Sequence, residues 1–138
     1  MKFLYSIALF AISALAQRAQ IGLPTENQDV TAGKEIVVQI QRPNSLSGST
    51  EIGVVIGFTS CVDAPCHTAE DVLGKVLYNG PFKPVYHESN LPPYENFSVT
   101  VPESAAKGKG QINVAHATLI GAGPSAFLES FNQTVTVA

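Results

Sequence analysis

Three histidines are the side chains in this sequence best suited to metal binding or acid–base chemistry, and they stand far apart. His67, His87 and His116 fall in different stretches, with no HxH or HExxH spacing. A metal site would need them to converge with further ligands, and a histidine without a supporting shell of hydrogen bonds seldom ligates a metal. The spacing therefore predicts no metal site and no cofactor.

The carboxylates give no better basis for catalysis. Glu70 and Asp71 are sequence neighbours, whereas glycoside hydrolysis needs two carboxyl groups that face each other across the scissile bond. The chain has no GxSxG motif for a nucleophilic serine. Its glycine turn at 121–123 lacks the lysine and hydroxyl residue of a phosphate-binding loop. We expect a protein that is not an enzyme.

The two cysteines predict one local disulfide. Cys61 and Cys66 are separated by four residues, and an even number of cysteines in an exported chain is typical of disulfide bonding. Closing so small a ring stabilises by about 2 kcal/mol, so the main role of the bond would be to fix one loop. Zinc is the alternative, with His67 as a third ligand, but a second pair of ligands is missing.

An irregular stretch at 79–94, NGPFKPVYHESNLPPY, concentrates prolines and aromatic residues. One interpretation is that its rings pack on the protein's own core, as most large apolar side chains do. The other is that they contact a partner, because aromatic residues in stiffened loops make efficient contacts. On the second interpretation the candidate partner contacts are Phe82, Tyr86 and Tyr94.

Two sequons mark candidate glycosylation sites. Asn96 is followed by Phe and Ser, and Asn132 by Gln and Thr. Both tripeptides have an acceptable middle residue, so both asparagines can accept a glycan in a eukaryotic secretory pathway.

The elements that must position these residues are β-strands. Period-2 apolar runs, separated by Gly- and Pro-containing turns, predict strands at 20–24, 34–41, 51–60, 75–78, 95–101, 111–120 and 130–137. Pro24 would confine the first strand to a sheet edge. Gly53 and Gly57 interrupt a nearly apolar run, which indicates a bulge or a close backbone contact.

These runs predict an all-β fold, an immunoglobulin-like antiparallel β-sandwich of about seven strands. Tryptophan is absent and the two cysteines are too close to join two sheets, so the antibody-type core would be missing. Residues 17–138 have the length of a single domain.

Residues 1–16, MKFLYSIALFAISALA, have the three parts of a secretory signal peptide. Lys2 precedes an apolar run, and Ala14 and Ala16 frame a small-residue cleavage site. The run is too short for a membrane span, which needs about 20 residues. We expect cleavage after Ala16 and a secreted, extracellular protein without a membrane anchor.

The charge composition argues against two classes of partner. The formal net charge is −3 and only 14% of residues are charged. A nucleic-acid-binding or lipid-binding domain would carry a basic surplus. Neither nucleic acid nor an anionic membrane is therefore expected to bind.

The order of these segments is similar to that of a known family. Ala32-Gly33-Lys34 precedes the first long strand, and a Gly-interrupted apolar strand follows. The second half contains FSVTVP at 97–102, a Lys-Gly turn at 107–110, INVAHATLIGAG at 112–123 and FNQTVTV at 131–137. This layout resembles the necrosis-inducing secreted protein family of fungal effectors, over most of the mature chain and best over 95–137.

The resemblance implies a small secreted fungal protein that acts on a plant or other host. It implies a non-catalytic protein that binds host proteins and modulates plant immunity, with immune receptor-associated kinases as partners and, in some members, cell death as an outcome. No motif of the family assigns an individual binding residue to this sequence.

Two other functions remain open at this point. An extracellular cell-wall or glycan-binding module could use Tyr78, Phe82, Tyr86 and Tyr94 as stacking faces, although the absence of tryptophan counts against it. A metal protein or enzyme would have to use His67, His87 or His116.

Overall fold

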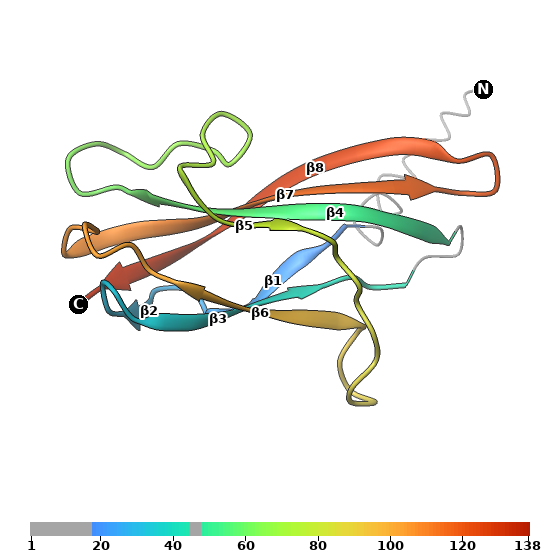
Figure 1. Cartoon of the computed structure of the whole chain (residues 1–138), viewed down its shortest axis with the longest axis horizontal. Coiled ribbons are helices and arrows are strands. Elements are labelled where there is room, and N and C mark those ends of the chain that lie inside the picture. The colour runs from blue at the N-terminus through green and yellow to red at the C-terminus, as the bar shows by residue number, and fades with distance from the viewer. Residues whose placement is uncertain (1–17, 45–47) are drawn as a thin grey trace, which may run out of the picture.

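The computed structural model describes residues 18–44 and 48–138, which form eight β-strands in two sheets (Figure 1). The strands are β1 (Gln20–Leu23), β2 (Gln28–Val30), β3 (Glu35–Gln41), β4 (Ser49–Ser60), β5 (Lys75–Gly80), β6 (Tyr94–Thr100), β7 (Gly108–Ile120) and β8 (Ser125–Val137). The all-β class is confirmed. No helix that could cross a membrane occurs in the described residues. The predicted signal peptide, 1–16, lies outside them.

The sheets have three and five strands. Their orders are β1-β3-β6 and β2-β8-β7-β4-β5. All pairs are antiparallel except β2 with β8, which is parallel. The expectation of a purely antiparallel sandwich is therefore wrong at β2.

The parallel pair arises where the chain changes sheets. Pro24 has no N–H to donate, so β1 ends there at the edge of the small sheet, as predicted. A turn follows, in which the Gln28 N–H donates to the Thr25 carbonyl at 3.0 Å. After this turn, β2 runs beside the C-terminal strand β8 and in the same direction as β8.

The core lies between the two layers and follows the period-2 pattern of the sequence. Alternate side chains on each strand turn inward, with Val38 and Ile40 from one sheet and Ile56, Ile112 and Val114 from the other all fully buried. Each such side chain contributes about 1.5–3 kcal/mol when it leaves water. This burial is the main force that holds the layers together.

The loop between β4 and β5, residues 61–74, contains the disulfide and covers the outer face of the large sheet. Cys61 and Cys66 are bonded, which confirms that prediction. Beneath the loop, the Gln111 side chain donates to the His67 carbonyl at 2.7 Å, and Asn113 donates to the Leu73 carbonyl at 3.2 Å. These bonds fasten the loop to β7 and explain why two polar residues on an outer face are buried.

Both glycines of β4 behave as the sequence predicted. The pairing of β4 with β7 shifts register between Glu51 and Gly53, and its pairing with β5 shifts between Ile56 and Gly57. A Cβ at Gly57 would lie 2.1 Å from the Leu73 carbonyl oxygen. Only glycine lets the covering loop approach the strand this closely.

Replacing Gly57 therefore tests how tightly the loop is seated. We expect Gly57→Ala to lower the free energy of unfolding by about 1–3 kcal/mol, because the methyl group must push the Leu73 backbone away. Urea unfolding measures the loss. Gly123→Ala is the control, since a Cβ there meets no atom within 4 Å, and it should change stability by less than about 0.5 kcal/mol. Equal stability of the two variants would contradict the close approach.

Candidate functional site

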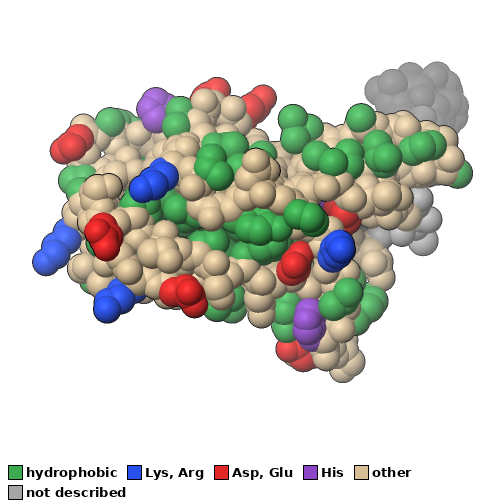
Figure 2. Space-filling view, viewed as in Figure 1, with side chains coloured by type: hydrophobic (Ala, Val, Ile, Leu, Met, Phe, Trp, Pro, Cys, Tyr) green, Lys and Arg blue, Asp and Glu red, His purple; other side chains and the backbone are tan. Residues whose placement is uncertain are grey.

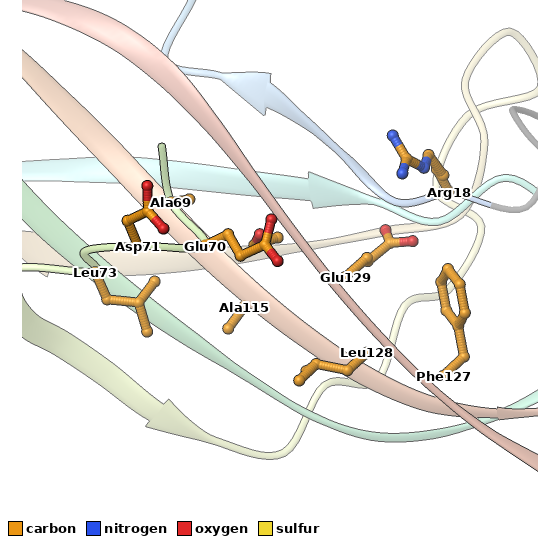
Figure 3. Close-up of a pocket in the computed structure, with 10 residues that line it drawn as sticks. Arg18, Ala69, Glu70, Asp71, Leu73, Ala115, Phe127, Leu128 and Glu129 are labelled. Carbon is orange, nitrogen blue, oxygen red and sulfur yellow. The ribbon is translucent and has the colours of Figure 1, made fainter. Parts of the chain in front are cut away.

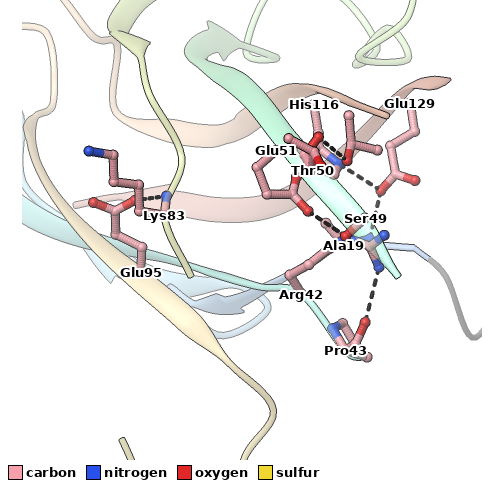
Figure 4. A network of polar contacts seen from close by, with 11 residues as sticks. Ala19, Arg42, Pro43, Ser49, Thr50, Glu51, Lys83, Glu95, His116 and Glu129 are labelled. Carbon is pink, nitrogen blue, oxygen red and sulfur yellow. Dashed lines mark hydrogen bonds and ion pairs between the residues drawn. The ribbon is translucent and has the colours of Figure 1, made fainter. Parts of the chain in front are cut away.

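Four charged side chains meet between the sheets toward one end of the sandwich (Figure 4). Arg42 follows β3, while Glu51, His116 and Glu129 come from β4, β7 and β8. His116 shares the inward face of β7 with Ile112 and Val114, and its side chain has no exposed surface. A cluster of charges in this position replaces apolar core.

Glu51 is the centre of the cluster. One of its carboxylate oxygens accepts from Arg42 Nε at 3.1 Å, and the other pairs with His116 Nε2. On the far side of the imidazole, Nδ1 lies 3.6 Å from Glu129 Oε1, which is an ion-pair distance and too long for a hydrogen bond. The same Glu129 oxygen accepts the Ala19 N–H at 2.7 Å. The cluster thus connects β4, β7 and β8 with the residue after β3 and with the start of the described chain.

The cluster favours a charged imidazole. Burial alone would lower the pKa of His116, but its contacts with Glu129 and Glu51 outweigh burial and raise that pKa above 6.5. Burial would likewise raise the pKa of Glu51, but the hydrogen bond and charge of His116, with smaller help from Ser49 and Arg42, hold it below 4.5. Two cations then balance two carboxylates. The His116 ring itself is closed to solvent, whereas Arg42 and Glu51 also line an open hollow of about 390 Å³ beside Phe82 and Lys83.

The aromatic stretch divides between core and surface. Phe82 is 2% exposed and packs edge-on against His116, with ring centroids 5.4 Å apart. Tyr94 is 6% exposed, stacks on His87 at 4.1 Å and donates its hydroxyl hydrogen to Glu88 at 2.9 Å. Neither ring is open to a partner, so both are wrong as candidate partner contacts. The interpretation that they pack on their own domain is the one the structure supports.

Tyr86 is the exception. Its side chain is 63% exposed, and its hydroxyl oxygen accepts from the Asn44 side chain, which joins the aromatic stretch to the segment after β3. Tyr78 packs against Phe97 at 4.6 Å and donates its hydroxyl hydrogen to the Pro81 carbonyl. Of the four rings considered for sugar stacking, Tyr86 alone is largely exposed, so they form no common platform for a glycan.

The remaining polar candidates do not converge either. His67 and His87 are exposed on different loops, away from the buried His116. No group of three metal-ligating side chains occurs in the described parts of the chain. Glu70 and Asp71, however, line a hollow of about 550 Å³ that also reaches Arg18 and residues 127–130 of β8 (Figure 3). Sequence reasoning missed this hollow, because β8 is distant from Glu70 in the chain.

A second hollow, of about 450 Å³, lies on the outer face of the large sheet. Its lining is mainly apolar and includes Ile52, Val55, Ala117 and Leu128. Leu128 is 74% exposed, and Figure 2 shows hydrophobic side chains gathered along the arm formed by β7 and β8. Exposed apolar groups of this kind are typical of interaction surfaces.

Both sequons are on the surface. Asn96 lies on β6 and Asn132 on β8, and both side chains are exposed. We expect each to be glycosylated when the chain passes through a eukaryotic secretory pathway. Asn96→Gln and Asn132→Gln should each remove one glycan from the intact mass, and glycosidase treatment should make all forms equal apart from the substitution. If a variant differs from the wild type only by the mass of the substitution, that sequon carries no glycan and the expectation for it is wrong.

The charge cluster predicts a stability maximum in mildly acidic solution. His116, with its raised pKa, adds stability that is complete below about pH 6.5 and is lost as the pH rises through the folded value. Glu51, with its lowered pKa, adds stability that is complete above about pH 4.5 and is lost as the pH falls through its folded value. Both contributions are present between these limits. Urea unfolding as a function of pH measures them.

His116→Gln is the variant that isolates the effect. It leaves two carboxylates in the core without the imidazolium, so we expect a loss of about 3–5 kcal/mol at mildly acidic pH. The decline of stability above neutral pH should also disappear. A wild-type profile that rises through this region would show that His116 is not held in its charged form.

Two comparisons relate this chain to known proteins. The model of the Nis1 family matches residues 14–136. Necrosis-inducing secreted protein 1 of Colletotrichum higginsianum (strain IMI 349063) is 31% identical over 138 residues, which cover 99% of this chain and 91% of that protein. The resemblance found in the sequence motifs is thereby confirmed over nearly the whole chain. This chain belongs to the Nis1 family of necrosis-inducing secreted effectors.

Proposed function

We propose that this protein is a secreted, non-catalytic effector that binds a host protein and modulates plant immunity. The observation that carries the proposal is the family match over residues 14–136, together with a relative that is named as necrosis-inducing and secreted. On this proposal residues 1–16 are the export signal, and the domain acts after leaving the fungal cell.

The distribution of polar groups supports binding rather than catalysis. Arg42, Glu51, His116 and Glu129 are engaged with one another inside the fold. The surface instead presents exposed apolar side chains on the large sheet, such as Ile52 and Leu128. Surfaces of this composition favour contact with another protein.

The host partners that we propose first are immune receptor-associated kinases, on the basis of the family resemblance. The fold that presents the surface is proposed to be immunoglobulin-like. Strands β1, β3 and β6 would correspond to A, B and E of that fold, and β8, β7, β4 and β5 to G, F, C and C′. The strand orders of both sheets support this assignment.

The flagellin-triggered oxidative burst tests the proposal. Leaves that express the chain with or without residues 1–16 are compared with leaves that express an unrelated secreted β-sandwich at the same level. We expect a reduced burst from one of the two forms, and the active form identifies the compartment of the target. An unchanged burst from both forms, with accumulated protein, would contradict immune modulation in that host.

A further inference from the structure

Most of strand β8 has a neighbour on one side only. On one side it pairs with β7 along its whole length, from Ser125 to Val137. On the other side β2 pairs only with residues 135–137, and the Asn27 N–H donates to the Thr134 carbonyl just before them. Within 18–44 and 48–138, no strand pairs with residues 125–133 on this side. A long sheet edge is thus left open.

The alternation of the backbone identifies the groups that face this edge. Thr134 accepts from Asn27 on the β2 side, and the Ala138 N–H donates to Val30 on the same side. A strand directs the N–H and C=O of every second residue to one side, and β8 has no register shift against β7. The residues whose N–H and C=O groups point to the open edge are therefore Ala126, Leu128, Ser130 and Asn132.

The open edge has little of the usual protection. Natural sheets guard exposed edges with lysine, proline, bulges or inward-pointing charges. Residues 125–131, SAFLESF, contain no lysine and no proline. Their single charge, Glu129, points inward toward Ala19 and His116 and is the one protective feature of the stretch. Apart from Glu129, nothing here opposes the addition of another strand.

A groove accompanies the edge. The hollow of about 550 Å³ is lined by the consecutive residues 127–130 of β8. Arg18 lies on one side of the strand, and Glu70 and Asp71 lie on the other (Figure 3). Its volume is within the range of ligand sites in proteins, about 300–1,000 Å³, and its course along a strand fits an extended chain.

We propose that the edge of β8 at 125–131 binds an extended segment of the partner protein as an added strand. This inference rests on the proposed function and assigns its binding surface. Main-chain hydrogen bonds to Leu128 and Ser130 hold the segment, as in other cases of strand addition. The segment carries apolar side chains along the strand and a lysine or arginine toward Glu70 and Asp71.

A second copy of the chain is the competing occupant, and its charge fits less well. It would bring its own residues 125–131 to the edge, and the only charge in that stretch is negative. Among the residues that the structure describes, the one cation that it would bring near the edge is Arg18, which lines the hollow in each copy and lies across the strand from Glu70 and Asp71. The net charge of −3 further opposes self-association.

Short random peptides displayed on phage, selected against the immobilised mature protein, provide the probe. Ser130→Pro removes an N–H that faces the edge and leaves the bonds to β7 in place, so we expect selected peptides to lose about ten-fold in affinity. Thr100→Pro is the matched control. Tyr94 exchanges bonds with Val85 on the open side of β6, so by alternation the Thr100 N–H faces solvent on the other sheet.

Peptides rich in lysine or arginine that bind the wild type and Thr100→Pro but not Ser130→Pro would support the proposal. Failure to select any peptide, or equal affinity for Ser130→Pro, would overturn it. A wild-type dimer that Ser130→Pro converts to a monomer would also overturn it, in favour of a second copy.

The leaf assay separates this proposal from the proposed function. A burst that is reduced by the wild type and equally by Ser130→Pro would refute the edge as the binding surface while the effector function stands. A burst that the wild type leaves unchanged would refute the effector function, and the peptide result would still decide whether the edge binds extended chains.

Discussion

The ion pairs around His116 are the polar constraint that fixes how the strands around the apolar core meet. They join β4, β7 and β8 to Arg42, which follows β3, and reach the Ala19 backbone before β1, so the long strands of the large sheet are tied to the small one. Removing one member would leave a buried charge uncompensated, at a cost of about 3–5 kcal/mol. The cluster also turns Glu129 inward. Because Glu129 is the only charge in residues 125–131, no charged side chain of that stretch points to solvent beside the unpaired edge.

This arrangement places the charge cluster between the sheets and leaves apolar side chains on the outer face of the large sheet. The His116 ring is enclosed between the sheets with Phe82 packed edge-on against it, while Arg42 and Glu51 also line an open hollow. The loop held by the disulfide covers one part of the large sheet through Gln111 and Asn113. The remainder of that sheet presents Leu128 and other apolar side chains beside an unpaired edge. On the proposed function, this surface is the part of the domain that contacts another protein.

Local patterns in the sequence predicted most of the strands, but pairing over long distances escaped them. Gly53 and Gly57 predicted irregular pairing, because a glycine inside a strand often marks a bulge or a close backbone contact. The β8 strand begins at Ser125, five residues earlier than expected, since its first part lacks β-branched residues and is stabilised by β7. His116 alternates with Ile112 and Val114 along β7, so the sequence pattern placed its side chain on the inward face of the strand. Its partners come from other strands, which no local pattern could identify.

Amide hydrogen exchange along β8 tests the central claim most directly. In the free mature protein at low concentration, we predict fast exchange at Ala126, Leu128 and Ser130 and slow exchange at the alternate residues, whose N–H groups bond to β7. A saturating selected peptide should slow the three fast amides. Uniformly slow exchange in the free protein, or fast exchange that the bound peptide does not change, would contradict binding through an open β8 edge.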